Sequence, residues 1–391
     1  MKALLIAFLL LSAALRLHDL GAQSLWYDEG NSYVQSTRSL SAIADNAARD
    51  IHPPGYYWLL AGWRALMGES EFALRSLSAF ASILSAALTY AIGRRLMGKT
   101  GGILALLFVT LNSFSIYYAQ EARMYALLTL WSAASFYALI RLIERPTPRL
   151  ALILGLLNAA GLWTHYAFPF FMLAQGFIVV LAMKPRRWIA FAGASLLAVA
   201  IFAPWIPTAL HQLSTWGQVR DLVPLEESLL MLLRWLSFGI SADAIAPAVA
   251  LLVMLFGLLQ WGKPGIGLLV PILWVIVPVG VFLAFDLFRE ANLKFLLPAQ
   301  IGMALWLARG VIGVRTVLTP PGQNMRLPRW ALPTLMIIML TDGALRLYTD
   351  PAYQRPDYRA AAARISVVGM ATLASNLLGL DHNSQPVTPL Y

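Results

Sequence analysis

The most constraining feature of this sequence is a series of apolar runs, each close to the length that crosses a lipid bilayer. Of the 391 residues, 59% are hydrophobic and 12% are charged. Inside a bilayer every backbone N–H and C=O must find a partner within the protein, and a helix of about 20 residues achieves this while spanning the hydrocarbon core. The sequence therefore predicts an all-α polytopic membrane protein. About eleven spans are expected, near residues 3–17, 73–93, 102–118, 125–141, 150–164, 167–182, 188–206, 244–260, 266–285, 294–312 and 330–347.

Short basic loops between these runs set the expected orientation. Lys and Arg are enriched in cytoplasmic loops, so we assign the basic loops to the cytoplasm. This places the N-terminus inside and the C-terminus outside, with residues 1–17 as an uncleaved first span. The basic loops contain Arg94, Arg95 and Lys99; Arg141, Arg145 and Arg149; Lys184, Arg186 and Arg187; Lys263; and Arg309, Arg315, Arg326 and Arg329.

The first outer loop, residues 18–71, is predicted to carry helices that lie in the membrane interface. Pro54–Met67 is short, rich in Trp and Tyr, and opens with two prolines, which suits an interfacial helix better than a span. Leu40–Arg49 is a second, mildly amphipathic candidate. Pro207–Asp243 forms another long outer loop. Residues 1–347 thus form one transmembrane domain, and residues 348–391 form a short extracytoplasmic tail.

The charges of the chain are distributed unequally between the two sides. In the expected topology nearly all acidic residues lie outside, with Glu144 as the clear exception. This predicts a polar, water-filled cavity at the outer face. The net charge of +10 lies mainly in the short basic loops, so the expected partners are membrane lipids and not nucleic acid. The chain has no cysteine, which excludes thiol chemistry and disulfides.

The stretch Ser24–Gly30 places two adjacent carboxylates, Asp28 and Glu29, beside Trp26 and Tyr27 at the expected membrane edge. Ionisable groups beside a bilayer are costly and are therefore candidates for function. A general base must be an ionised carboxylate partly shielded from water, and the two aromatic residues could provide that shielding. The alternative is an aromatic belt residue followed by acids that only face water.

Two further polar clusters fall on the same side. Asp50 and His52 precede two prolines and Tyr57, and the prolines fix the backbone around His52. The alternative for His52 is an interfacial capping role. The hairpin after residue 118 carries Tyr118, Glu121 and Arg123. Arg123 suits bidentate phosphate binding, and a Glu121–Arg123 pair that pins the hairpin is the alternative.

The last two clusters lie later in the chain. His165 stands where two short spans meet outside, either as a functional group or as part of the aromatic belt. Asp286, Arg289, Glu290 and Lys294 precede Pro298. Lys294 could meet a lipid phosphate, or it could reach the interface as long basic side chains commonly do.

Metal ligation is a weaker hypothesis for the same residues. Asp28, His52 and Glu121 are the candidate ligands, and the candidate ions are Mg²⁺, Mn²⁺, Ca²⁺ and Zn²⁺. However, the sequence contains no ligand spacing such as HExxH. No phosphate-binding glycine loop or nucleophile elbow stands out, so nucleotide chemistry of the soluble type is not supported.

The order of these motifs resembles the glycosyltransferase C superfamily. The resemblance rests on the SLWYDE loop, the DIHPPGYY element, the YYAQEARMYAL hairpin, the THY turn and the late KFLLP helix, and it extends from the N-terminus to about Arg315. The most similar branch is family 39, which includes protein O-mannosyltransferases and aminoarabinose transferases of lipid A. Lys294 stands where relatives often have Arg-Tyr, and the tail after Asp357 is shorter than in many relatives.

This resemblance implies an inverting glycosyltransferase of the bacterial plasma (inner) membrane. It would transfer a sugar from a polyprenyl phosphate to a hydroxyl or amine of a lipid, glycan or protein at the extracytoplasmic face. By the resemblance Asp28 is the catalytic base with Glu29 beside it. Donor-phosphate contacts are Arg123, Lys294, Tyr118 and Arg289, and supporting substrate contacts are His52, Asp50, Tyr57, Glu121 and His165. A transporter of lipid-linked sugars and a non-catalytic subunit of a membrane complex are the alternative functions.

Overall fold

The computed structural model describes residues 2–215, 224–259, 265–318, 331–355 and 358–364. These residues form helices joined by turns and contain no β-strand, which confirms the all-α class. The predicted basic positions Lys263, Arg326 and Arg329, and the tail beyond residue 364, lie outside the described residues.

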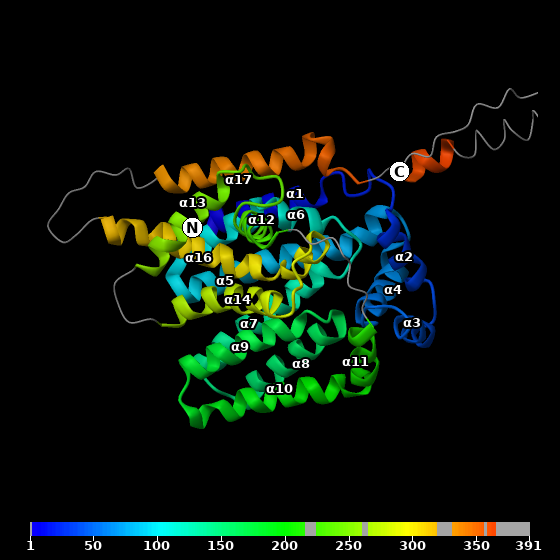
Figure 1. The fold of residues 1–391 in the computed structure, drawn as a ribbon, viewed down its shortest axis with the longest axis horizontal. Coiled ribbons are helices and arrows are strands. Elements are labelled where there is room, and N and C mark those ends of the chain that lie inside the picture. The colour runs from blue at the N-terminus through cyan, green and yellow to red at the C-terminus, as the bar shows by residue number, and fades with distance from the viewer. Residues whose placement is uncertain (1, 216–223, 260–264, 319–330, 356–357, 365–391) are drawn as a thin grey trace, which may run out of the picture.

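Most of the helices form an elongated bundle (Figure 1). Within it α1 packs against α5, α5 against α7 and α16, α8 against α7 and α10, and α14 against α9 and α16. Trp274 of α14 stacks on Phe136 of α7 with ring centroids 3.7 Å apart. The bundle helices are α1 (Lys2–Leu17), α5 (Glu71–Leu111), α6 (Ser113–Ala119), α7 (Tyr125–Glu144), α8 (Pro148–Thr164), α9 (Phe168–Ala182), η1 (Pro185–Arg187), α10 (Trp188–Phe202), η2 (Ala203–Trp205), α12 (Leu225–Ser237), α13 (Ala246–Leu258), α14 (Ile266–Ala284), α15 (Glu290–Leu293), η3 (Lys294–Leu296), α16 (Ala299–Leu318) and α17 (Ala331–Thr349).

Element α5 is a helical hairpin and not one long rod. Gly98 has φ of 77°, a left-handed backbone conformation that glycine adopts without steric cost. Arg16 donates hydrogen bonds both to Ser82 and to the carbonyl of Val109. A straight helix would place these two residues about 40 Å apart. The chain therefore reverses at Gly98, as the predicted spans 73–93 and 102–118 with a basic turn between them require.

Apolar helices support an integral membrane protein. Within the described ranges, five helices are long and apolar enough to cross a bilayer, and a sixth is obtained if Glu290–Leu296 and Ala299–Val314, bent by 67°, form one span. Helices α8, α9 and α13 are shorter and apolar. This number treats α5 as one helix, although its chain reverses at Gly98. The expected total of eleven spans therefore stays a prediction.

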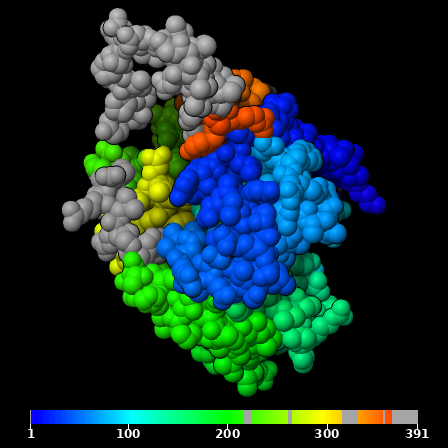
Figure 2. Space-filling model, turned by 90° about the vertical axis from the view of Figure 1, so that its right-hand side faces the viewer, coloured from blue at the N-terminus to red at the C-terminus, as the bar shows by residue number. Residues whose placement is uncertain are grey.

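Four short helices gather at one end of the bundle, on the right in Figure 1. They are α2 (Tyr27–Ser36), α3 (Leu40–Ala47), α4 (Gly55–Met67) and α11 (Ile206–Thr215). We call this end the outer end, following the expected topology. Helices α3 and α4 match the two helices predicted in the first outer loop. Figure 2 looks onto this end and shows the first outer loop, in blue, covering its middle.

Several element boundaries differ from the prediction. Residues 27–36, expected as a loop, form α2, and the expected loop 207–243 contains most of α11 and all of α12. The span expected over 102–118 is interrupted at Asn112, whose side chain caps α6 by accepting a hydrogen bond from the Ser115 N–H. The helix expected from Lys294 begins only at Ala299, because Pro298 cannot continue a preceding helix.

One fully buried cation, Arg16, joins α1 to both arms of α5 and to α6. Its guanidinium donates to the hydroxyls of Ser82 and Ser115 and to the carbonyls of Val109 and Thr110. Those carbonyls belong to the last turn of α5, where no intrahelical N–H is available and the helix dipole favours a positive charge. No carboxylate of the described residues pairs with Arg16, so these dipoles stabilise its charge.

We predict that Arg16→Met lowers the free energy of unfolding by about 3 kcal/mol, because it leaves buried hydroxyl and carbonyl groups without donors. Denaturant unfolding of the purified protein in detergent measures this. Arg94→Met, at an exposed position of α5, is the matched control and should be neutral. Equal stability of the two variants would contradict this account of Arg16.

Candidate active site

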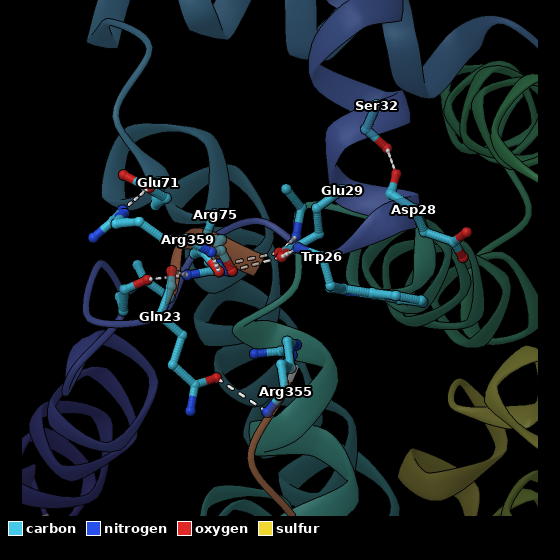
Figure 3. Close-up of polar contacts among 12 residues, drawn as sticks. Gln23, Trp26, Asp28, Glu29, Ser32, Glu71, Arg75, Arg355 and Arg359 are labelled. Atoms are coloured by element: carbon cyan, nitrogen blue, oxygen red, sulfur yellow. Dashed lines mark hydrogen bonds and ion pairs between the residues drawn. The ribbon is translucent and has the colours of Figure 1, made fainter. Parts of the chain in front are cut away.

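The adjacent carboxylates of α2 point in different directions (Figure 3). Glu29 is fully buried and points toward Arg75 of α5. Arg75 Nε lies 2.8 Å from Glu29 Oε1, and Arg75 Nη2 lies 2.7 Å from Oε2. Arg75 also donates to the carbonyls of Leu20, Gln23 and Ser24. This pair therefore ties the loop before α2 to the start of α5.

Glu29 is fully engaged by its surroundings. It accepts further hydrogen bonds from the backbone N–H groups of Trp26 and Ala122, at 3.3 and 2.8 Å. Burial disfavours its charge, but the bond from Arg75 and the charges of Arg355 and Arg75 outweigh burial and lower the pKa of Glu29. A carboxylate with all of its acceptor directions occupied is poorly placed to take a proton from a substrate. Its position suits a structural role, in contrast to the expected catalytic one.

Asp28 has the opposite character. Its carboxylate points away from the Glu29–Arg75 pair (Figure 3), and its side chain keeps 29% exposure. Asp28 Oδ2 lies 3.8 Å from Nη2 of Arg123, which comes from the hairpin after α6. Arg123 also donates to the Asp28 carbonyl and to Ser32, at 3.4 and 3.3 Å. The structure thus brings together two residues that are far apart in the sequence and leaves Asp28 accessible.

Glu121 lies in the same hairpin and is almost fully buried. Its Oε2 has no hydrogen-bond partner among the described residues. Burial raises the pKa of Glu121, although the charges of Arg355 and Lys294 oppose this effect. The alternative of a Glu121–Arg123 ion pair is not found within the described part of the chain, where Arg123 pairs with Asp28. Glu121 therefore remains available to a ligand.

The Asp50–His52 element faces the same region. His52 Nδ1 lies 3.6 Å from Asp50 Oδ2, and the Tyr57 hydroxyl lies 3.5 Å from the same oxygen. Burial and the charge of Arg123 lower the pKa of His52. Burial opposes the charge of Asp50 as well, but contact with His52 holds the pKa of Asp50 below its usual value. The pair is therefore an ionised Asp50 beside a neutral His52 at neutral pH.

His165 joins this region from the turn after α8. Its ring centroid lies 5.7 Å from that of His52 and 4.6 Å from that of Phe295. His165 Nδ1 accepts the Ala167 N–H at 3.0 Å, so the proton of a neutral ring resides on Nε2. Burial lowers the pKa of His165 well below its usual value, which keeps the ring neutral. Its Nε2 has no partner in the described chain and remains a buried donor.

Lys294 completes the group. Its Nζ lies 5.0 Å from the centroid of the Tyr125 ring, a cation–π arrangement, and Tyr118 meets the same ring edge to face at 5.4 Å between ring centroids. Lys294 is close enough to interact electrostatically with Asp28 and Glu121. We call the whole set the outer polar cluster. It consists of Asp28, Asp50, His52, Tyr57, Tyr118, Glu121, Arg123, Tyr125, His165 and Lys294.

An apolar groove of about 560 Å³ adjoins this cluster. Its walls include Phe170, Leu213, Phe285 and Phe295, and His165 belongs both to the groove and to the cluster. Arg289 lies at the groove with its Nη2 3.5 Å from Asp286 Oδ2. Arg289, a predicted contact of the donor phosphate, thus lies in the groove wall. The other predicted donor and substrate contacts lie in the cluster.

Several buried polar atoms without a partner lie in or near the cluster, although others lie elsewhere in the described chain. Those in or near the cluster are Trp26 Nε1, His52 Nδ1, Tyr56 OH, Glu121 Oε2, Arg123 Nε and His165 Nε2. An unsatisfied buried polar atom costs about 1–3 kcal/mol, so a polar ligand or water that completes these hydrogen bonds would be stabilised here. Both donors and acceptors are represented, as recognition of sugar hydroxyls and phosphate requires.

The cluster does not provide a metal site. Within the described ranges no three His, Cys, Asp or Glu side chains gather closely enough to share an ion. The predicted ligands Asp28, His52 and Glu121 therefore do not form such a group.

Part of the chain matches a known protein family. Residues 51–210 match the family described as dolichyl-phosphate-mannose-protein mannosyltransferase, and this region contains His52, Glu121, Arg123 and His165. Over these residues the chain is similar to a family of lipid-phosphate-dependent sugar transferases, a type found in the glycosyltransferase C superfamily. This confirms the resemblance seen in the sequence.

A curated relative resembles the chain in sequence, and two solved structures resemble it in fold. The undecaprenyl phosphate-α-4-amino-4-deoxy-L-arabinose arabinosyl transferase of Edwardsiella ictaluri is 27% identical over 213 residues, which cover 49% of this chain and 38% of that protein. The chain thus spans less than half the length of this relative. The fold resembles that of the Archaeoglobus fulgidus oligosaccharyltransferase, crystallised with Zn and sulfate, at a TM-score of 0.54 and 11% identity, covering 88% of this chain and 52% of that one. The same oligosaccharyltransferase in complex with an inhibitory peptide and a dolichol-phosphate also gives a TM-score of 0.54 at 11% identity, with 91% and 56% covered.

Sequence reasoning missed two residues on which the site depends. Arg75 holds Glu29, and it lies inside a span that was treated as uniformly apolar. Arg355, from the chain after α17, reaches the hairpin that carries Glu121. A charged residue within an apolar span is costly and is therefore a candidate for a specific role, and this signal could have identified Arg75. Nothing local in the sequence indicates Arg355.

We predict that Glu29→Gln lowers the free energy of unfolding by about 3 kcal/mol, because it leaves the charge of Arg75 buried without its counter-ion. The double variant Glu29→Met/Arg75→Met should lose less stability than the sum of the losses in Glu29→Met and Arg75→Met, since each single variant leaves the other charge buried alone. Denaturant unfolding of the wild type and these variants measures the cycle. Additive losses in the double variant would show that the two side chains are not coupled.

The same pair gives the wild-type protein a defined pH dependence. The pKa of Glu29 is lower in the folded state than in the unfolded state, so its stabilising contribution is complete above the unfolded-state pKa, about 4.3, and is lost as the pH falls further. Glu29→Gln should lack this component of the acid destabilisation.

Proposed function

We propose that this chain is a membrane-embedded glycosyltransferase that transfers a sugar from a polyprenyl phosphate to an acceptor hydroxyl or amine, with inversion, and with Asp28 as general base. The observation that carries this proposal is the pairing of an accessible Asp28 carboxylate with Arg123 at 3.8 Å, beside an apolar groove. A base for the acceptor and a cation for the donor phosphate therefore lie side by side.

The groove suits the lipid part of such a donor. A polyprenyl chain is apolar, and the aromatic and aliphatic walls of the groove would remove it from water. The phosphate would lie where the groove meets the cluster, within reach of Arg123, Lys294 and Arg289, while Tyr118 packs against the ring beneath Lys294. The names of the similar proteins include undecaprenyl phosphate and dolichol-phosphate, which supports a donor of this class.

The reaction needs few catalytic groups because the donor is already activated. Asp28 takes the proton of the acceptor hydroxyl or amine, and the freed electron pair attacks the anomeric carbon opposite the phosphate. The bond between that carbon and the phosphate oxygen breaks, and its electrons pass to the phosphate, whose charge Arg123 and Lys294 stabilise. One displacement inverts the configuration of the sugar.

The remaining groups of the cluster suit recognition of the sugar. Glu121 Oε2 and the His165 Nε2–H offer an acceptor and a donor that are buried and unpaired within the described residues. Asp50, His52 and Tyr57 form a rigid polar wall next to them. In this proposal Glu29 acts as a positioning residue, since its bonds to Arg75 and to the Ala122 N–H fix α2 relative to the hairpin.

We propose that this site lies at the extracytoplasmic face of the plasma membrane, which the expected cytoplasmic position of the basic loops supports. There the acceptor, a lipid, glycan or protein, would approach through the exposed side of Asp28.

We predict that Asp28→Asn reduces transfer about a thousandfold without loss of stability, because the amide cannot accept the proton. The assay follows release of undecaprenyl phosphate from undecaprenyl-phosphate sugars in proteoliposomes. Asp45→Asn, an exposed position on α3, is the control and should remain active. Full activity of Asp28→Asn would overturn its assignment as the base. Absence of turnover by the wild type with every such sugar would favour the non-catalytic alternative.

We predict that Arg123→Gln weakens binding of undecaprenyl phosphate about thirtyfold, the factor expected for loss of a charge-assisted hydrogen bond of about 2 kcal/mol. Titration of the protein in nanodiscs with undecaprenyl phosphate measures the dissociation constant. Arg141→Gln, on α7 in a predicted cytoplasmic loop, is the matched control. Unchanged affinity of Arg123→Gln would exclude a phosphate contact at this position.

A further inference from the structure

The chain after α17 turns back across the outer end of the molecule. It forms η4 (Pro351–Tyr353), where Asp350 accepts the Ala352 N–H at 2.9 Å, and it continues to Arg355 and then over residues 358–364. Figure 2 shows this part of the chain, in red-orange, lying against the blue first outer loop. We call residues 350–355 and 358–364 the strap.

The strap contacts the segment that leads into α2. The Arg355 N–H donates to Gln23 Oε1 at 3.3 Å, and the Arg359 N–H donates to Ser24 Oγ at 3.4 Å. The Arg359 guanidinium also pairs with Glu71, the first residue of α5 (Figure 3). Only a few residues separate Gln23 and Ser24 from Asp28, so the strap contacts the stretch that positions this carboxylate.

The same strap also contacts the hairpin that carries Arg123. The Arg355 guanidinium lies 4.6 Å from the centroid of the Tyr117 ring, and its Nη2 donates to the Tyr117 carbonyl at 3.1 Å. Tyr117 belongs to the end of α6, immediately before Glu121 and Arg123. The charge of Arg355 acts on both Glu29 and Glu121. Arg355 thus contacts both segments, with its backbone N–H on Gln23 before Asp28 and its guanidinium on Tyr117 before the Arg123 hairpin.

The bridge is not backed by a packed core. A cavity of about 210 Å³ lies between the strap, the segment after α1 and the end of α6, and Gln23, Tyr117 and Arg355 are among its lining residues. A contact made by a few polar groups beside a cavity has little to replace it when one group is removed. Glu29 and Arg123 join the same two segments nearer to Asp28, so Arg355 holds them at the end that faces the strap.

We propose that Arg355 is a positioning residue through which the strap holds the Asp28 segment and the Arg123 hairpin in register. Because a guanidinium both stacks on a ring and donates to a carbonyl, arginine suits this bridging position. That the register serves transfer rests on the function proposed above, whereas the mechanical coupling does not.

Hydrogen exchange of the full chain in nanodiscs tests the coupling. Arg355→Ala keeps the N–H bond to Gln23 but loses the guanidinium contacts with Tyr117. It should speed amide exchange about tenfold in residues 117–124, as loss of a charged hydrogen bond predicts, and by a smaller factor in residues 23–32, which lose their link to α6. Arg364→Ala, at an exposed position of the same strap, is the matched control and should leave both segments unchanged. Faster exchange confined to residues 351–364 in Arg355→Ala would overturn the proposal.

A spectroscopic readout separates positioning from a general loss of structure. Infrared titration of the Glu121 carboxyl, assigned by comparison with Glu121→Gln, should shift to higher pH in Arg355→Ala, because a nearby positive charge is lost. Arg355→Lys keeps that charge and should titrate as the wild type does. An unshifted titration in Arg355→Ala would contradict the placement of Arg355 beside the hairpin. Undecaprenyl phosphate binding by the wild type reports on the proposed function separately, so failure of one proposal is distinguishable from failure of the other.

Discussion

The buried pair of Glu29 and Arg75 is the interaction on which the outer end depends. Arg75 reaches from α5 to the carbonyls before α2, and Glu29 reaches from α2 to the N–H of Ala122 in the hairpin. Three segments distant in the sequence are thereby fixed by two side chains. Because a buried charge without its partner is costly, the pair resists any movement that separates these segments. The neighbouring Asp28 is left accessible on a rigid support.

Buried charges are stabilised differently at three places in the molecule. Arg16 is stabilised by the carbonyl end of a helix, and Arg75 is stabilised by a carboxylate. Both are fully bonded and suit structural roles. In the cluster around Asp28, the charged groups themselves keep unpaired atoms, Glu121 Oε2 and Arg123 Nε, and the contact of 3.8 Å is one that a ligand can enter. Incomplete bonding of the charged groups thus separates the candidate site from Arg16 and Arg75.

Much of this arrangement was accessible from the sequence, for identifiable physical reasons. Apolar runs predicted the helical class, and paired prolines predicted the start of α4, because both follow from local chemistry. The convergence of Asp28, His52, Glu121, Arg123 and His165 followed from placing the basic loops on one side. Helix α2 was missed because its Gly-Asn-Ser sequence has low helix propensity and its first turn is held by tertiary contacts to Glu29. The separate roles of Asp28 and Glu29 could not be predicted from two neighbouring acidic residues in the sequence, because these roles depend on which carboxylate contacts Arg75. The role of Arg355 could not be predicted from the sequence, because its partners lie more than two hundred residues away in the chain.

A cryo-electron microscopy map of the protein with undecaprenyl phosphate tests the central claim most directly. The account predicts density for the phosphate between Arg123 and Lys294, with the lipid chain in the groove lined by Phe170 and Phe285 and with the Asp28 carboxylate facing the phosphate. Phosphate density at the opposite end of the bundle, or an Asp28 side chain turned into lipid, would contradict it.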